Sequence, residues 1–404
     1  MNEKSARLTN LINGVSEKLV MVLFFLISPV AIAAPKGIVP LLAIAGVSGM
    51  ISWLHNGRPT VRLPRLPMLL LVLTMLWALI SSLWAIDTTG AAILTARLTV
   101  LCVCGLALMH TLTKSDDKVR RRLEYFFLTG YGLGAVVLLT GYFYARMTNT
   151  SLWSSFANDP LTTLNNGATM MALLYFPFAV ILWKRNFLRI AIAAGVLLLG
   201  GLYFLSSEAA VLSLIAGTAV CILVIVMGRT GIFIVAGVIC ATFIAAPTLS
   251  EVFLAPSPAG NYEVAPPTST EHRKLIWQFV NGRISEKPVW GWGMDSSREI
   301  PKEAFRISSN LEVLPLHPHN SALQVRLELG WPGTILVAAL IASLFWVLCL
   351  PGLSVIPSAV GAAVISSYMT TGYISYGVWQ NWWVAAAWAI AGLTWLVSNS
   401  KGTE

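Results

Sequence analysis

The chain has 404 residues, of which 56% are hydrophobic and 11% are charged. A soluble domain carries about 25% charged residues, whereas apolar runs of about 20 residues, the length that crosses a bilayer core, recur along this whole chain. The composition therefore excludes a soluble globular protein and indicates a multi-pass membrane protein. The net charge of +9 does not indicate nucleic-acid binding, because lysine and arginine accumulate in the cytoplasmic loops of membrane proteins.

Twelve apolar runs predict an all-α polytopic membrane protein with about 12 transmembrane helices. The first run, Leu19–Ala34, follows a basic segment and lacks a convincing cleavage site, so we expect a retained span and not a signal peptide. The other runs lie at residues 38–54, 66–86, 91–112, 123–145, 164–183, 187–205, 208–227, 231–250, 330–350, 355–374 and 380–397.

Basic residues in alternate short connections predict the orientation of these helices. These residues are Arg58, Arg62 and Arg65; Lys114, Lys118, Arg120, Arg121 and Arg122; Lys184, Arg185 and Arg189; and Arg229. Cytoplasmic placement of these connections puts both termini in the cytoplasm. The long segment between helices 9 and 10 then lies outside, in the periplasm if the cell is Gram-negative.

Three regions follow from this pattern. Residues 1–250 carry helices 1–9, residues 251–329 form a periplasmic catalytic loop with short helices, and residues 330–404 carry helices 10–12 and a short cytoplasmic tail. Within the loop, a Pro- and Gly-rich strap precedes Thr268-x-x-Glu271, which fits a helix capping box. An apolar stripe predicts an amphipathic helix from Thr268 to near Gly282. The stripe consists of Leu275, Ile276, Phe279 and Val280.

The sequence shows no pattern typical of a metal site or a disulfide framework. All five cysteines fall in apolar runs, and Cys102-x-Cys104 has neither a second pair nor a partner histidine nearby. The outer face also lacks a D-x-D motif or clustered carboxylates, which a divalent cation would require. We therefore expect no metal and no cofactor.

Polar chemistry concentrates in the outer loop. Its end carries Leu316–His317–Pro318–His319–Asn320, and a histidine with an ordinary pKa of about 6.5 can act as a base toward a hydroxyl nucleophile. Arg273 and Lys274, on the predicted amphipathic helix, can bind phosphate oxygens. Trp277 offers a flat apolar face for a sugar or for anchoring at the lipid headgroups. Together these residues predict transfer from a lipid-linked phosphate donor.

The same segment resembles a known family. His319–Asn320, nine residues, Gly330, two residues and Gly333 reproduce the pattern of the O-antigen ligase family: H, then N, S or Q, nine residues, G, two residues, and G, T or Y. The family also includes O-antigen polymerases and bacterial O-oligosaccharyltransferases. Arg273-x-x-x-Trp277, Pro288 and Gly291-x-Gly293 are also similar to its outer-loop pattern. The similarity covers roughly residues 200–350.

The resemblance implies an inverting, metal-independent glycosyltransferase of lipopolysaccharide biosynthesis in the cell envelope. It would move an O-antigen glycan from undecaprenyl pyrophosphate to a hydroxyl of lipid A-core, with membrane lipids as its other partners. The resemblance also implies that His319 is the catalytic base and that Arg273 binds the donor pyrophosphate. The candidate substrate-binding residues are Arg97, Glu208, His317, Asn320, Lys274, Arg326 and Trp277.

The chain departs from the family at one place. Members often carry Ser-Arg-Gly at the outer start of a helix, where the arginine binds phosphate, but this chain has Ser206–Ser207–Glu208. Either another cation substitutes, or Glu208 orients His319 or an arginine. Arg97, expected to be buried inside the fourth helix, is a candidate for the missing charge. Arg326, seven residues after His319, is expected to share its helical face.

Alternatives remain open at this point. An O-antigen or exopolysaccharide polymerase would use the same donor with a different acceptor. A lipid-linked glycan transporter is favoured less, because no paired interrupted helices are visible in two halves of the chain. His317 can assist the site or only shape the His-Pro-His turn.

Overall fold

The computed structural model describes residues 3–56, 64–153, 161–253, 269–301, 306–308, 311–312, 314 and 316–399. The helices are α1 (Glu3–Ala33), α2 (Ile38–Asn56), α3 (Arg65–Ser81), α4 (Thr88–Lys114), α5 (Asp117–Thr148), α6 (Asn165–Lys184), α7 (Leu188–Phe204), α8 (Glu208–Met227), α9 (Arg229–Ile244), α10 (Ala246–Phe253), α11 (Ser269–Glu286), α12 (Ser321–Val347), α13 (Val355–Ile374) and α14 (Asn381–Asn399). Three 3-10 turns connect some of them: η1 (Pro35–Gly37), η2 (Ser82–Trp84) and η3 (Thr162–Leu164).

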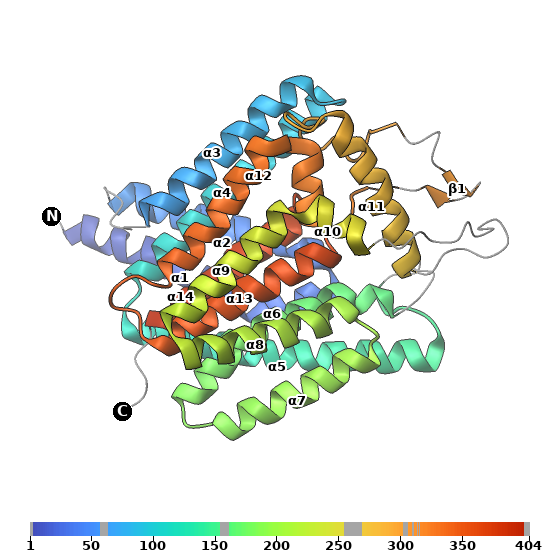
Figure 1. Ribbon diagram of the computed structural model, residues 1–404. Coiled ribbons are helices and arrows are strands. Elements are labelled where there is room, and N and C mark those ends of the chain that lie inside the picture. The colour runs from blue at the N-terminus through green and yellow to red at the C-terminus, as the bar shows by residue number, and fades with distance from the viewer. Residues whose placement is uncertain are drawn as a thin grey trace.

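The long helices form one elongated bundle (Figure 1). Helix α1 begins and α14 ends at the same end of the bundle, and α11 lies at the opposite end. Two short strands, β1 (Arg306–Ser308) and β2 (Leu311–Glu312), pair antiparallel with Arg306 opposite Glu312. The helical class is therefore confirmed, but this hairpin lies where the sequence favoured only short helix and coil.

Eight of the described helices are long and apolar enough to cross a membrane, namely α1–α6, α8 and α12. The count becomes nine if the bent pair α9–α10 is one span. Each of the twelve predicted apolar runs falls on a helix. The protein is thus a multi-pass helical protein with about eight candidate spans, and the count of twelve stays a prediction.

One predicted helix boundary is wrong and another is incomplete at the end of the bundle that carries α11. The ninth run was expected to be one helix to residue 250, but α9 ends at Ile244 and α10 turns away by 77°. The tenth helix was expected to start at residue 330, where α12 does resume after a break at Gly330, but α12 also extends back to Ser321, where Asn320 caps it. Within the described residues the amphipathic helix also continues past Gly282 to Glu286, and an Arg283–Glu286 ion pair supports this extra turn. Thr268 of the predicted capping box lies outside the described residues.

Helix α11 packs through its apolar stripe on the part of α12 that precedes Gly330. Ile276, Phe279 and Val280 are buried in the same apolar core as Leu323 and Leu327 of α12. The stripe predicted from the sequence is therefore confirmed. The indole N–H of Trp277, next to this stripe, donates to the carbonyl of Pro318, so α11 lies beside the turn that precedes α12.

The Gly330 kink interrupts α12. Gly330 has φ +62° and ψ −156°, a conformation that favours glycine. The break leaves backbone groups of α12 without partners in the helix, and the turn after α11 bonds them. Trp331 N–H donates to Val289 O at 2.9 Å, and Gly293 N–H donates to Glu328 O at 2.8 Å. A side chain at residue 330 would meet the backbone of residues 289–291. The first motif glycine therefore allows two backbones to cross.

Candidate functional site

The His-Pro-His turn is fixed by the start of α12. The side-chain Oδ1 of Asn320 accepts hydrogen bonds from the N–H groups of Ala322 and Leu323, both at 3.0 Å, which is an N-cap. His319, just before this cap, has a left-handed backbone with φ +54°, an uncommon conformation for a residue with a side chain. Asn320, predicted to bind substrate, thus uses its side-chain oxygen to cap the helix.

The ring of His319 is held in one tautomer. Its Nδ1 lies 2.8 Å from the carbonyl oxygen of Ser375, in the connection between α13 and α14. Because a carbonyl only accepts, Nδ1 carries the proton and Nε2 of the neutral ring keeps its lone pair. Burial lowers the pKa of His319, and the charges of Arg273 and His272 lower it further, against the opposing effect of the Ser375 hydrogen bond. The ring is therefore neutral near pH 7.

His317 holds the backbone of the turn through hydrogen bonds of its ring. Its Nδ1 accepts a hydrogen bond from the backbone N–H of His319 at 3.1 Å, and its Nε2 lies 3.0 Å from Nε2 of Gln380. The side chain is buried, and this burial lowers the pKa of His317 to about 3, with His319 and Arg298 contributing. Of the two roles considered for His317, shaping the turn has these direct contacts.

Arg273 comes to the site from α11 and Glu208 comes from the first residue of α8. Nη1 of Arg273 lies 4.0 Å from Oε2 of Glu208, and their side chains are 29% and 73% exposed. The glutamate that replaces the family arginine therefore contacts an arginine, one of the two tasks considered for it. The pair is long and exposed, so the guanidinium stays accessible to a second anion.

Trp277 and Lys274 also belong to α11. The indole N–H of Trp277 donates to the carbonyl of Pro318 at 2.9 Å, so the half-buried ring supports the His-Pro-His turn. Lys274 is half-buried next to Arg273. The predicted substrate contacts of both residues stay predictions.

Arg97 and Arg326 differ from their predicted placement. Arg97 is exposed on α4 while its neighbour Leu98 is buried, so the predicted burial of Arg97 is wrong: the side chain points away from the packed face. Arg326 is buried, with its guanidinium 3.4 Å from the centre of the Trp331 ring. The seven-residue spacing does not put Arg326 on a shared helical face with His319, because His319 precedes α12.

Two partners of the site were missed by sequence reasoning. Ser375 acts through its backbone carbonyl, which leaves no mark in the sequence. Glu328 is a fully buried carboxylate inside an apolar helix, and such a group is functional by default. Its position four residues after Gln324 was the available signal, because residues at that spacing meet on a helix.

The described part of the chain lacks a cluster of metal-ligating side chains. No group of three or more His, Cys, Asp and Glu side chains there could hold a metal ion. The five cysteines are free. Independence from metal stays a prediction for the reaction itself.

At the end of the helical bundle that carries α11, these residues place a neutral imidazole and an accessible guanidinium together. Such a site can accept a proton beside a bound anion. Residues 193–338 match the family model described as O-antigen ligase. The resemblance to the O-antigen ligase family is thus confirmed for this region of the chain.

Curated relatives agree with this assignment. A protein of Rickettsia conorii named "Putative polysaccharide ligase" is 27% identical over 351 residues, which cover 84% of this chain and 82% of that protein. Similarly named proteins of Rickettsia felis and Rickettsia typhi are 37% and 36% identical. Each of these two alignments covers 34% of this chain and 32% of the relative.

Proposed function

We propose that this protein is a glycosyltransferase that moves an O-antigen glycan from undecaprenyl pyrophosphate to a hydroxyl of lipid A-core. The observation that carries the proposal is the His319 ring with Nδ1 bonded to Ser375 and Nε2 unprotonated, in the electrostatic range of Arg273. The family match and the names of the relatives support the reaction class. In this account the site faces the periplasm from the inner membrane, and both termini are cytoplasmic.

The proposed reaction is a single displacement. The acceptor hydroxyl oxygen forms a bond to the anomeric carbon while the bond from that carbon to the pyrophosphate oxygen breaks. The hydroxyl proton passes to Nε2 of His319, and the bonding electron pair leaves with undecaprenyl pyrophosphate. Attack opposite the leaving group inverts the anomeric centre. A base that is neutral near pH 7 suits this step, because only the unprotonated ring can take the proton.

Arg273 stabilises the leaving pyrophosphate in this proposal. A fixed cation at the atoms where negative charge develops lowers the barrier without a metal ion. The exposed, 4.0 Å contact with Glu208 keeps the guanidinium in place before the donor arrives and is weak enough to yield to a phosphate. Lys274, the next residue of α11, is a second cation for the pyrophosphate in this proposal.

The test uses purified wild-type protein and His319→Ala with undecaprenyl-pyrophosphate glycan and lipid A-core in EDTA. Product size is followed on a gel. We expect glycan on lipid A-core with the wild type and none with the variant. Loss of wild-type transfer in EDTA, restored by added Mg²⁺, would contradict the metal-independent mechanism.

The same gel separates the polymerase alternative. A polymerase would lengthen the lipid-linked glycan and leave lipid A-core unmodified. That result would overturn the proposed acceptor while leaving the role of His319 testable with the same variant. No transfer by an intact wild-type protein to either acceptor would overturn the enzyme proposal.

A further inference from the structure

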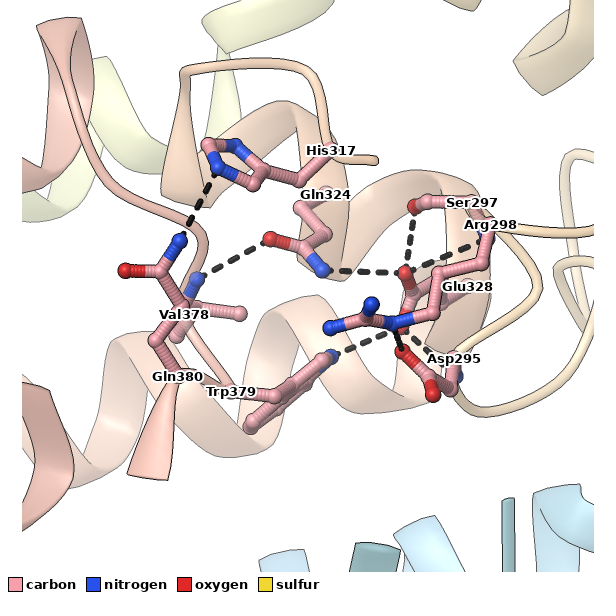
Figure 2. A network of polar contacts seen from close by, with 9 residues as sticks. All are labelled: Asp295, Ser297, Arg298, His317, Gln324, Glu328, Val378, Trp379 and Gln380. Atoms are coloured by element: carbon pink, nitrogen blue, oxygen red, sulfur yellow. Dashed lines mark hydrogen bonds and ion pairs between the residues drawn. The ribbon is translucent and has the colours of Figure 1, made fainter. Parts of the chain in front are cut away.

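Glu328 is the most enclosed carboxylate beside the candidate site. The side chain is 0% exposed and lies in the outer half of α12, before the Gly330 kink. Its Oε2 accepts from Asp295 N–H at 2.9 Å and from the indole N–H of Trp379 at 2.7 Å. Its Oε1 accepts from Gln324 Nε2 at 3.0 Å and from the hydroxyl of Ser297. Figure 2 shows these donors converging on one carboxylate.

The donors come from three segments that are far apart in the sequence. Asp295 and Ser297 belong to the turn after α11, Gln324 belongs to α12, and Trp379 belongs to the connection between α13 and α14. The backbone N–H of Ser297 also donates to Oε1, at 3.4 Å. Five donors around two oxygens suit a carboxylate, which only accepts. A glutamine at this position would replace one of the two accepting oxygens by an NH₂ group, which would face other donors. The hydrogen bonds lost on that side are buried, and leaving buried donors unpaired is costly.

Gln324 extends the network to the connection at residues 375–380. The N–H of Val378 can only donate, and it donates to Oε1 of Gln324 at 2.9 Å. That bond fixes the orientation of the amide, so Nε2 of Gln324 faces Glu328. Glu328 thus holds the connection at two neighbouring residues, directly at Trp379 and through Gln324 at Val378.

The same connection, residues 375–380, also contacts both histidines and the first residue of α12. Ser375 O accepts from Nδ1 of His319 at 2.8 Å. Gln380 contacts His317 at 3.0 Å, and Tyr376 O accepts from the hydroxyl of Ser321 at 3.2 Å. A shift of the connection would therefore move the one carbonyl that sets the tautomer of His319.

We propose that Glu328 is a positioning residue for His319: it holds the 375–380 connection against α12, keeps the Ser375 carbonyl at Nδ1, and so leaves Nε2 free to act as the base. Glu328 touches neither substrate in this account and acts only through Trp379, Gln324 and Ser375. The effect on the histidine ring follows from the contacts alone. The effect on glycan transfer rests on the function proposed above.

The variants Glu328→Gln and Trp379→Phe test this proposal in the full-length protein in detergent. Glu328→Gln keeps the shape of the side chain and removes two acceptor positions. Trp379→Phe removes one donor and keeps an aromatic ring, so it serves where Glu328→Gln does not fold. Glu299→Gln is the matched control, because Glu299 is an exposed carboxylate in the same outer segment with no part in the network.

Two readouts are needed. The first is the ¹⁵N spectrum of histidine-labelled protein, assigned with His319→Ala, which reports the tautomer of His319 without any substrate. The second is the initial rate of glycan transfer, with KM for the donor measured separately from kcat. We expect both variants to lose the single Nδ1–H tautomer and to lower kcat by about 10- to 100-fold, the usual size for a residue that orients another, with KM little changed.

The outcomes are distinct. If Glu328→Gln and Trp379→Phe keep the single tautomer of the wild type, Glu328 is only a structural residue and the proposal is overturned, whatever their thermal stability. If the tautomer is lost but kcat equals that of Glu299→Gln, positioning does not control catalysis and the proposal is also overturned. Absence of transfer by the wild type would refute the proposed function alone, because the spectra would still decide the role of Glu328.

Discussion

The start of α12 and helix α11 supply the candidate site with side chains that are held in very different ways. His319 is bonded to a backbone carbonyl, its turn is capped by Asn320, and the supporting carboxylate Glu328 accepts five hydrogen bonds. Arg273 on α11 has one ion pair at 4.0 Å with a partner that is 73% exposed. A base must keep one tautomer, so it is fixed. A cation that meets a flexible diphosphate gains from remaining accessible.

The largest expected effect on stability comes from breaking the fixed side at the kink. Gly330→Ala should lower the free energy of unfolding by at least about 2 kcal/mol, since a strained left-handed conformation alone costs about 1–3 kcal/mol. The added methyl would also meet the backbone at Val289–Gly291. Gly282→Ala on α11 is the control, because a side chain there meets nothing within 4 Å. Thermal unfolding in detergent gives the comparison, and equal midpoints for the two variants would refute the crowded crossing.

Removing the accessible cation should lower the transfer rate more than removing its exposed partner does. Arg273→Gln is expected to lower the transfer rate by about 10²- to 10³-fold, the usual size for loss of one group that stabilises developing charge. Lys287→Gln, at the exposed far end of the same segment, should keep the wild-type rate. Equal losses in both variants would point to general surface charge and not to a bound diphosphate.

The Arg273→Gln variant should also shift the pH profile. The charge of Arg273 lowers the pKa of His319, so its removal raises that pKa. Because His319 acts only when unprotonated, activity is lost as the pH falls through this pKa. The acid limb of the residual activity should therefore move to higher pH than in the wild type. The measurement is kcat against pH from 5 to 8. An unchanged acid limb would show that the charge of Arg273 does not act on the pKa of His319.

The smallest effect should come from the exposed partner. Glu208→Gln is expected to change the transfer rate less than about fivefold, because an exposed ion pair is worth about 0.2–1 kcal/mol. The amide removes a competitor of the donor phosphate, so KM for the donor should fall or stay level. A loss of 100-fold or more in kcat would show that Glu208 has a chemical task of its own.

Helix type and the apolar stripe of α11 could be predicted because periodicity and apolar length reflect burial directly. The part of α12 before Gly330 could not, because Gly330–Trp331–Pro332–Gly333 resembles the start of a helix, and α12 does resume there after its break. In the structure, residues 289–293 bond the backbone groups on both sides of Gly330. Glu208 beside Arg273 depends on how α8 and α11 meet, and Ser375 acts through a carbonyl. Neither contact has a local signal.

The two histidines of the turn give the most direct test of the central claim, that Nε2 of His319 is the base for glycan transfer. His319→Asn keeps a donor for the Ser375 carbonyl and removes Nε2, and asparagine tolerates the left-handed backbone. His317→Asn keeps an acceptor for the His319 N–H. Initial rates should fall by about 10²- to 10⁴-fold for His319→Asn, the usual contribution of a general base, and by less than about tenfold for His317→Asn, the cost of a weakened hydrogen bond. A wild-type rate in His319→Asn would contradict the account.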